Sequence, residues 1–286
     1  MPLEELDAKA GAKPVQTGLN INDIQDFTPP SAKNAASTSA DTSSSNPLND
    51  SFDVAQAKPS ATKTVYLDVG HCTSAEKDPF TGKVDQGFVT KDYTECQLNT
   101  AVGKMVAKNL LDAGFQVIPT WNPFSDQKPT PVPKQEDLAR RNAVVNNDIA
   151  KYCDDSIYLS IHHDMDSTKK GGQCVYIADN KWNQAMPLAK AIQGSAWQVR
   201  ERDNVSQCIN SDTATQNGQL KGLRGVNSVG VLVEAANAMN PQDRALMSSP
   251  AHLAREARTI SQGVINYFKL QPGKDRPLPV CRRSLG

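Results

Sequence analysis

The feature that constrains the fold most is a regular alternation of short apolar runs and longer segments with helical periodicity. It begins near Thr62 and continues to about residue 270. The apolar runs are Thr64–Val69, 115–120, 156–162, 172–178 and 229–234, and the helical segments are 98–111, 135–151, 184–201 and 250–268. Helical crossovers of this length join parallel strands. The alternation therefore predicts a single α/β domain over 62–270, with a mostly parallel central sheet flanked by helices.

The two ends of the chain differ from this pattern. Of the 31 residues from Ser31 to Ala61, 15 are Ser or Ala, which is too little apolar surface to offset the entropy of ordering the segment. Residues 1–61 are predicted to be a disordered tail and linker. Spaced apolar residues in 15–28 leave open a docking segment for a carrier or virion protein, although a solvated tail is the preferred interpretation. Residues 271–286 are predicted to be an irregular tail.

Charge and hydropathy exclude several classes of protein. The chain has 31 Lys and Arg against 31 Asp and Glu, which gives no electrostatic reason to expect nucleic acid or an anionic membrane as a partner. No apolar run approaches the roughly 18 residues of a membrane span, so membrane insertion is not expected. The N-terminus lacks the basic and apolar regions of a signal peptide. Six cysteines without a CxxC pair argue against a zinc ribbon or a thioredoxin-type site.

Three of the predicted strands end in residues that bind metals or transfer protons. The first strand leads to His71, the third to His162, His163 and Asp164, and the fifth to Glu234. Three of the four histidines in the chain are in this set. Because the carboxyl ends of parallel strands meet at one edge of a sheet, these side chains are expected to converge there.

Each of these residues also has an ordinary interpretation. A single histidine at a strand end is more often a hydrogen-bonded surface residue than a ligand. Glu234 is harder to explain in this way, because burying a carboxylate after an apolar strand costs several kcal/mol unless it is paired or bound to metal. Two imidazoles together with carboxylates favour zinc.

A third metal ligand is suggested by the start of the next helix. Thr94 and Gln97 have the spacing of a capping box, which places Glu95 in the first helical turn, where the helix dipole favours its charge. An ordinary first-turn acid is the alternative interpretation.

Five motifs in order carry a family resemblance. VYLDVGH, a Glu that opens the next helix, LxxRxxxxN, SIHHD and VLVEAANAMNPQD together resemble the zinc-dependent N-acetylmuramoyl-L-alanine amidases of peptidoglycan, over roughly 62–270. The resemblance implies one Zn²⁺ per chain, bound by His71, Glu95 and His162, with Glu234 as the catalytic carboxylate. Four further residues are expected to contact the substrate or to support the site: His163, Asp164, Arg141 and Asn240. Of these, Arg141 is expected to support the fold or the site rather than the chemistry.

The chain departs from the family pattern directly after two of the expected ligands. Cys72 follows His71 where the family usually has Gly, and Cys96 follows Glu95. A disulfide between them requires Cα atoms within about 7 Å; two independent buried thiols are the preferred interpretation. Cys174 and Cys208 are another candidate pair, which no spacing rule supports.

The resemblance implies hydrolysis of the amide bond between the lactyl group of N-acetylmuramic acid and L-alanine in bacterial peptidoglycan. Zinc would acidify a water, and Glu234 would take its proton and return it to the leaving amine. One alternative is a zinc peptidase or amidase that acts on another amide. A second is a structural or docking component of a phage particle or secretion machine that uses an amidase-like domain to bind the wall. The complete ligand set argues against an inactive domain.

The expected substrate lies outside the cytoplasmic membrane. The chain is therefore expected to act in the periplasm or cell wall, after delivery by phage lysis, a virion or a secretion apparatus. The sequence does not choose among these routes.

Overall fold

The computed structural model describes residues 63–77, 84–123, 125, 130–152, 156–167, 171–199, 208–215 and 219–270. The predictions for 1–61 and 271–286 lie outside the described residues. The described strands are β1 (Thr64–Val69), β2 (Gln116–Pro119), β3 (Ser156–Asp164), β4 (Cys174–Ile177), β5 (Cys208–Ser211) and β6 (Val229–Asn237). They form one sheet in the order β2-β1-β3-β6-β4-β5.

The sheet is parallel except at one pairing. β2, β1, β3 and β6 run in the same direction, whereas β4 is antiparallel to β6 and is followed by β5, which is parallel to β4. The mostly parallel sheet predicted from the sequence is therefore confirmed. The strands that lead to His71, His162 and Glu234 are neighbours in it, so their carboxyl ends share one edge.

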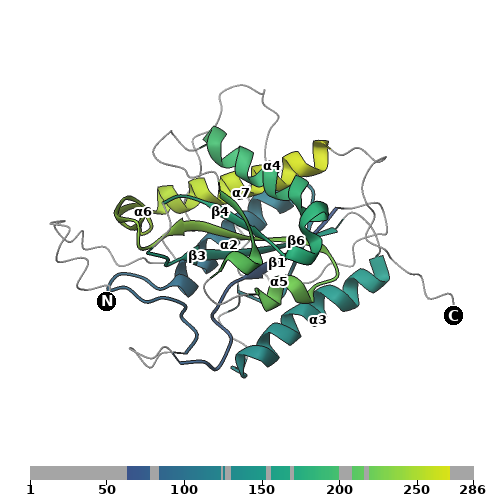
Figure 1. Cartoon of the computed structure of the whole chain (residues 1–286), viewed down its shortest axis with the longest axis horizontal. Coiled ribbons are helices and arrows are strands. Elements are labelled where there is room, and N and C mark those ends of the chain that lie inside the picture. The colour runs from purple at the N-terminus through teal and green to yellow at the C-terminus, as the bar shows by residue number, and fades with distance from the viewer. Residues whose placement is uncertain are drawn as a thin grey trace, which may run out of the picture.

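Helices cover both faces of this sheet. They are α2 (Glu95–Asp112), α3 (Lys134–Tyr152), α4 (Trp182–Val199), α5 (Lys221–Gly225), α6 (Pro241–Leu246) and α7 (Pro250–Leu270), with short 3₁₀ turns η2 (Asp179–Lys181) and η3 (Asp212–Ala214). Figure 1 shows α4 and α7 on one side of the sheet and α3 and α5 on the other. α2 packs against α7 and β3, and so belongs to the first layer. The single α/β domain with flanking helices is thus observed.

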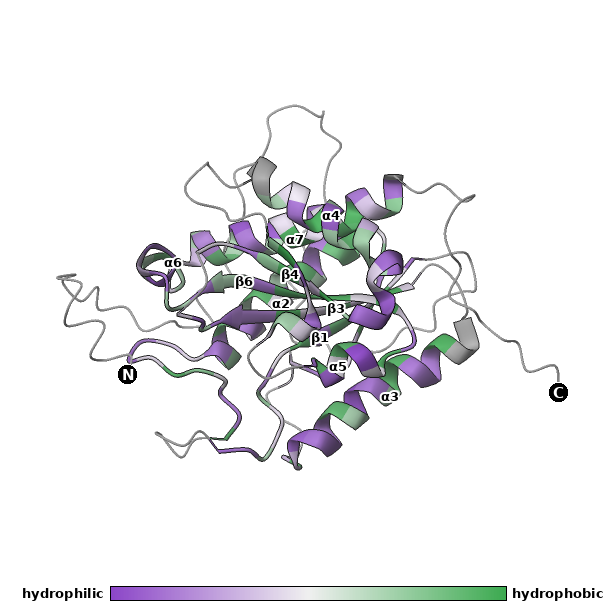
Figure 2. Cartoon of the chain, viewed as in Figure 1, coloured by the Kyte–Doolittle hydropathy of each residue, from purple (hydrophilic) through white to green (hydrophobic). Residues whose placement is uncertain are grey.

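Strand alternation sorts the side chains into two cores. Leu159 and Ile161 belong to the larger cluster, which lies under α2, α4 and α7, and Tyr158 belongs to the smaller cluster, which lies under α3 and α5. β1, β3 and β6 are mostly apolar, although β3 ends in the polar residues 162–164, whereas the helices have mixed character (Figure 2). Because successive residues point to opposite faces, His162 shares a face with Tyr158, and His163 shares the other face with Ile161.

Two strands are longer than the sequence predicts. β6 continues past Glu234 through the small buried residues Ala235 and Ala236 to Asn237, and β3 continues to Asp164. The prediction that Glu234 ends its strand is wrong, because it is an internal residue of β6. β5, α5 and α6 were not predicted.

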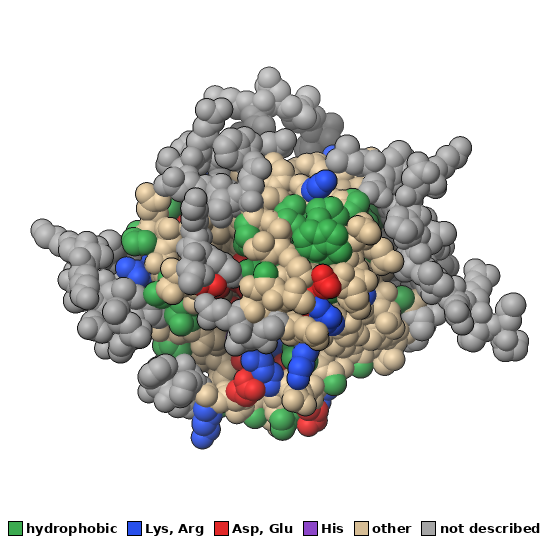
Figure 3. All heavy atoms as spheres, in the orientation of Figure 1, with side chains coloured by type: hydrophobic (Ala, Val, Ile, Leu, Met, Phe, Trp, Pro, Cys, Tyr) green, Lys and Arg blue, Asp and Glu red, His purple; other side chains and the backbone are tan. Residues whose placement is uncertain are grey.

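The surface agrees with the balanced composition. Acidic and basic side chains are intermixed over the face shown in Figure 3, without a field of one sign. Within the described parts of the chain, no helix has both the length and the apolar character needed to cross a membrane.

Candidate metal centre

The three residues expected to bind metal lie together at the carboxyl edge of the sheet. His71, Glu95 and His162 each offer one ligand atom, and these atoms are all within 4.8 Å of one another. The Nε2 atom of His71 is 3.2 Å from Oε2 of Glu95, and Nδ1 of His162 is 3.0 Å from Oε1 of Glu95. The side chains come from the loop after β1, the first residue of α2, and β3.

The two histidine–carboxylate separations, 3.2 and 3.0 Å, fit a metal ion of the size of zinc. Zinc bonds of 2.0–2.1 Å in tetrahedral geometry place neighbouring ligand atoms about 3.3 Å apart. The two histidine side chains remain about one fifth exposed, at 21% and 20%, while that of Glu95 is 8% exposed. The cluster is therefore buried on the protein side and open on the other, as a catalytic metal site requires.

Local sequence accounts for the position of Glu95. Thr94 and Gln97 form the predicted capping box, so α2 begins at Glu95. The Glu95 carboxylate accepts hydrogen bonds from the Asn99 side-chain amide and the backbone N–H of His163, both at 3.3 Å. These contacts hold the carboxylate toward the two imidazoles.

Two glycines leave room for the ligands. A Cβ atom on Gly87, which has a φ of +65°, would lie 2.3 Å from Oε2 of Glu95. A Cβ atom on Gly70 would lie 2.2 Å from the His162 ring. Any larger residue at either position would displace a ligand.

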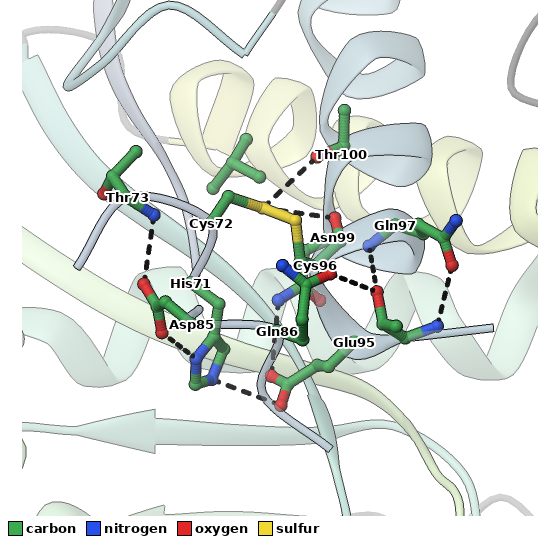
Figure 4. The surroundings of a disulfide bond; sticks show 12 residues. His71, Cys72, Thr73, Asp85, Gln86, Glu95, Cys96, Gln97, Asn99 and Thr100 are labelled. Atoms are coloured by element: carbon green, nitrogen blue, oxygen red, sulfur yellow. Dashed lines mark hydrogen bonds and ion pairs between the residues drawn. A yellow bond between two sulfur atoms is a disulfide. The ribbon is translucent and has the colours of Figure 1, made fainter. Parts of the chain in front are cut away.

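Asp85 orients His71 and was not predicted. Its Oδ1 atom is 2.9 Å from Nδ1 of His71, and its Oδ2 atom accepts a hydrogen bond from the backbone N–H of Thr73 (Figure 4). The same Oδ2 atom also accepts the backbone N–H of Ser74. Because an ionised carboxylate can only accept, Nδ1 of His71 carries the proton. When a metal is bound, the neutral ring would offer it the lone pair of Nε2, the ring atom that faces Glu95, as in the carboxylate–histidine pairs of metal sites.

The electrostatics of the cluster favour positive charge. Burial lowers the pKa of His71, but the Glu95 and Asp85 carboxylates outweigh it and raise the pKa to about 10. Burial raises the pKa of Glu95, yet the two histidines hold it well below its usual range. Because a metal binds imidazole in its neutral form, the Glu95 and Asp85 carboxylates would supply two negative charges to balance a divalent cation.

A buried ionic layer lies beneath the ligands. Arg141 is 4% exposed, pairs with Asp68 and Asp137, and donates hydrogen bonds to the carbonyl oxygens of Val69 and His71, each at 2.7 Å. Burial raises the pKa of Asp68, but the Arg141 charge and further hydrogen bonds lower it to about 2. Arg141 thus supports the loop that carries His71.

Glu234 lies beside the metal ligands in the sheet. It is the register partner of His162 across the parallel pair β3 and β6, so both side chains are on the same face. Glu234 is half-buried and comes from a different strand than any of the three ligands.

His163 points away from this face. It is 2% exposed, with Nδ1 2.8 Å from Oδ1 of Asn99 and Nε2 3.3 Å from Glu256 in α7. Because Asn99 also contacts Glu95, this geometry fits support of a ligand rather than contact with substrate. Asn99 and Glu256 were not predicted, since no local pattern links them to the ligands.

Asp164 and Asn240 take part in the loops around the site. Asp164 is the half-buried last residue of β3, and its carbonyl accepts the N–H of Ala238 at 2.7 Å. Asn240 is the N-cap of α6, and its side chain accepts the N–H groups of Gln242 and Asp243. The role of Asn240 in this structure is therefore to begin a helix.

Both candidate cysteine pairs form disulfides. Cys72–Cys96 has a Cα separation of 5.3 Å, and Cys174–Cys208 one of 4.6 Å. The preference for independent thiols at Cys72 and Cys96 is wrong. The sequence did not reveal how the left-handed turn after β1 directs the Cys72 side chain toward the start of α2.

Residues 65–266 match the family model described as N-acetylmuramoyl-L-alanine amidase. No curated protein shows significant similarity to the chain.

Solved structures share the fold at low identity. Ami1 from Mycobacterium smegmatis is 20% identical, covers 74% of this chain and 99% of its own, and has a TM-score of 0.56. The CwlD amidase from Clostridioides difficile, solved in complex with the GerS lipoprotein, is 19% identical, covers 73% and 100%, and has a TM-score of 0.55. The catalytic domain of the CD27L endolysin targeting Clostridia Difficile is 20% identical, covers 71% and 97%, and has a TM-score of 0.52.

Proposed function

Because the chain belongs to the N-acetylmuramoyl-L-alanine amidase family, we propose that it is a zinc-dependent enzyme that hydrolyses the bond between N-acetylmuramic acid and L-alanine in bacterial peptidoglycan. The observation that carries the proposal is the convergence of His71, Glu95 and His162 within 4.8 Å, with Glu234 in register beside His162. A module that only binds the wall has no need of this set.

Two of the three metal ligands are oriented by neighbouring side chains. The Nε2 atom of His71 is held in place by Asp85 on the opposite side of the ring, and Glu95 is held by Asn99. Bound zinc supplies a Lewis acid that polarises the substrate carbonyl and acidifies water. The open side of the cluster is where the substrate amide approaches.

Glu234 is proposed to move the proton. Its carboxylate is on the same sheet face as His162, on a strand that supplies no ligand. It accepts the proton that the attacking water loses and delivers it to the nitrogen of the leaving L-alanine, so the C–N bond breaks as the amine is protonated.

We also propose that the chain acts in the periplasm or cell wall. The disulfides Cys72–Cys96 and Cys174–Cys208 support this location, because disulfides persist in oxidising compartments. Delivery by phage lysis, a virion or a secretion apparatus, with residues 1–61 docking to a carrier, stays a prediction.

The test is hydrolysis of purified peptidoglycan by the full chain, with labelling of newly exposed amino groups. Each cut at the proposed bond exposes the amino group of L-alanine, a chelator abolishes the reaction, and added zinc restores it. A different new N-terminal residue would identify a peptidase or amidase for another bond. Wall binding without any cut would identify a docking module.

Replacing one expected ligand tests whether the zinc is bound at this site. His162→Ala removes one of three ligands, and two remaining ligands hold zinc poorly. The purified variant is expected to contain less than about a tenth of the wild-type zinc, measured by elemental analysis. Full zinc content in this variant would contradict the ligand assignment.

A further inference from the structure

The Cys72–Cys96 disulfide joins the two residues that directly follow two metal ligands. Cys72 follows His71 at the end of β1, and Cys96 follows Glu95 at the start of α2. The cysteines are 24 residues apart in sequence. Figure 4 shows the cross-link and, below it in this view, the contact between the His71 ring and the Glu95 carboxylate.

The loop that carries His71 has an unfavourable backbone. His71 has a φ of 63° and Cys72 a φ of 77°, so both lie in the left-handed region that favours glycine. A cysteine at position 72 costs conformational free energy that a glycine there would not. The disulfide that Cys72 forms with Cys96 is a stabilising interaction that glycine could not make, and it offsets this cost.

Hydrogen bonds hold the same two segments more weakly. The N–H of Cys72 donates to the carbonyl of Asp85 at 2.8 Å, and the N–H of Cys96 donates to the carbonyl of Gln86 at 2.9 Å. These two hydrogen bonds link the ligand segments through a third segment, which must keep its own place. One hydrogen bond, from the Asn99 side-chain amide to the carbonyl of Gly70 at 3.1 Å, joins the ligand segments directly. The disulfide adds a direct covalent link between them.

We propose that the Cys72–Cys96 disulfide is a positioning element of the metal site, which holds His71 and Glu95 at ligand distance before the metal binds. This inference rests on the proposed function. When the loop that carries His71 is already ordered, zinc binding does not have to supply the free energy of ordering it, so the zinc affinity is higher. Breaking the cross-link lowers this affinity while the ligands themselves stay intact.

The chain contains its own control. Cys174–Cys208 closes a comparable stretch, 34 residues in sequence, and joins β4 to β5 at the far edge of the sheet. Neither cysteine is next to a metal ligand in sequence; Cys174 is the register partner of Glu234, which is assigned to proton transfer rather than to metal binding. Removing it tests the loss of a disulfide without disturbing the ligand loop.

The experiment compares two double variants of the full chain, Cys72→Ala/Cys96→Ala and Cys174→Ala/Cys208→Ala. Zinc dissociation constants are measured by competition with a chromogenic chelator, and melting temperatures are measured without metal. Both variants are expected to melt about 5–15 °C below the wild type. Zinc affinity is expected to fall about 10- to 100-fold in the first variant, the usual scale for residues that support metal ligands, and to stay within about threefold in the second. Equal losses in both variants, or none in the first, would overturn the proposal.

Reduction of the wild-type chain provides a second measurement if the first variant does not fold. A water-soluble phosphine reduces the disulfide to two thiols and is oxidised to the phosphine oxide, with water supplying the oxygen and the two protons. Mass spectrometry of quenched aliquots identifies which pair has been reduced. Zinc affinity should fall as Cys72 and Cys96 appear as thiols and should not follow Cys174 and Cys208. Unchanged affinity after the first pair is reduced would refute the positioning role.

Zinc binding by the untreated wild-type chain separates the two proposals. A wild-type chain that binds no zinc contradicts the proposed function and the positioning role together. A wild-type chain that binds zinc as tightly as the variant without Cys72 and Cys96 contradicts the positioning role alone.

Discussion

Glu234 and His162 are side-by-side partners in neighbouring parallel strands, with their side chains on the same face of the sheet. One belongs to β6 and the other to β3, so the proton-transfer group and a metal ligand are held at a separation set by the sheet itself. The alignment does not depend on any loop.

Replacing Glu234 tests whether this residue accepts a proton or binds the metal. Glu234→Gln keeps the shape of the side chain and removes the proton acceptor, so zinc content is expected to stay at the wild-type level while kcat falls about 10²–10⁴-fold. Glu136→Gln, an exposed acid in α3, serves as the control and is expected to leave both unchanged. Loss of zinc from the Glu234 variant would make Glu234 a ligand instead.

Gly70 tests the packing of His162. A methyl group at this position would meet the imidazole ring, so Gly70→Ala is expected to displace His162 and weaken zinc binding at least about tenfold. Gly194 in α4 has nothing within 4 Å of its added Cβ, and Gly194→Ala is expected to keep zinc affinity and to raise stability by up to about 1 kcal/mol. Chelator competition and thermal unfolding measure the two effects. Wild-type affinity in Gly70→Ala would show that the ring has room to move.

Substitutions of Arg141 and of its sequence neighbour Arg140 test the buried ionic layer, with Arg140 as the exposed control. Arg141 is buried between two carboxylates, whereas the side chain of Arg140 is 55% exposed in a surface pair with Glu136. Arg141→Lys removes the planar guanidinium and most of its hydrogen-bond donors. The free energy of unfolding is therefore expected to fall by about 2–4 kcal/mol. Arg140→Lys is expected to change the unfolding free energy by less than about 0.5 kcal/mol. Denaturant titration measures both, and equal effects would contradict the buried ionic layer.

Asp68 makes stability depend on pH. Its pKa is about 2 in the folded chain and near the usual 3.8 when unfolded. A depressed pKa contributes stability that is present above pH 4 and is lost as the pH falls toward 2, a loss of about 2 kcal/mol here. Measured with chelator present, the stability difference between the wild type and Asp68→Asn should shrink over this range. The exposed control Asp112→Asn should show only a small difference in stability from the wild type. A constant difference for Asp68→Asn would show that its pKa is not depressed.

Removal of residues 1–61 tests the predicted domain boundary. The family match begins at residue 65 and every site residue lies beyond it, so a fragment that starts at Thr62 is expected to keep its zinc content and its kcat on peptidoglycan. Limited proteolysis of the full chain should cut within 31–61 and release this fragment. A folded but inactive fragment would show that the removed residues shape the site.

Local patterns were enough to locate most of the site. The capping box at Thr94 and Gln97 placed Glu95, and the apolar runs of β1 and β3 placed the two histidines at one edge of a parallel sheet. The capping box and the apolar runs are each recognised within a few residues of sequence. Because the strands are parallel neighbours, the residues that follow them meet at the same edge of the sheet.

The missed features depend on contacts between distant residues. Asp85 is a single acid in a loop, and only the folded chain brings it to His71. β5 is four half-buried residues, Cys208–Ser211, without an apolar run to reveal it. The end of β6 was misplaced because Ala235 and Ala236 carry no strong strand signal, although the sheet buries them fully.

The position of Arg141 has a consequence for how the site is lost. The Arg141 guanidinium donates hydrogen bonds to the carbonyls of Val69 and His71 and pairs with two buried carboxylates, and the Cys72–Cys96 disulfide joins the same turn to α2. Opening this turn alone in the disulfide-bonded chain would therefore leave a buried charge without its partners. The amide hydrogens of the turn after β1, such as that of Cys72, should therefore exchange with deuterium only when the whole domain opens. The metal-binding geometry would then disappear in one cooperative step as the temperature rises, without a preceding range of gradual softening.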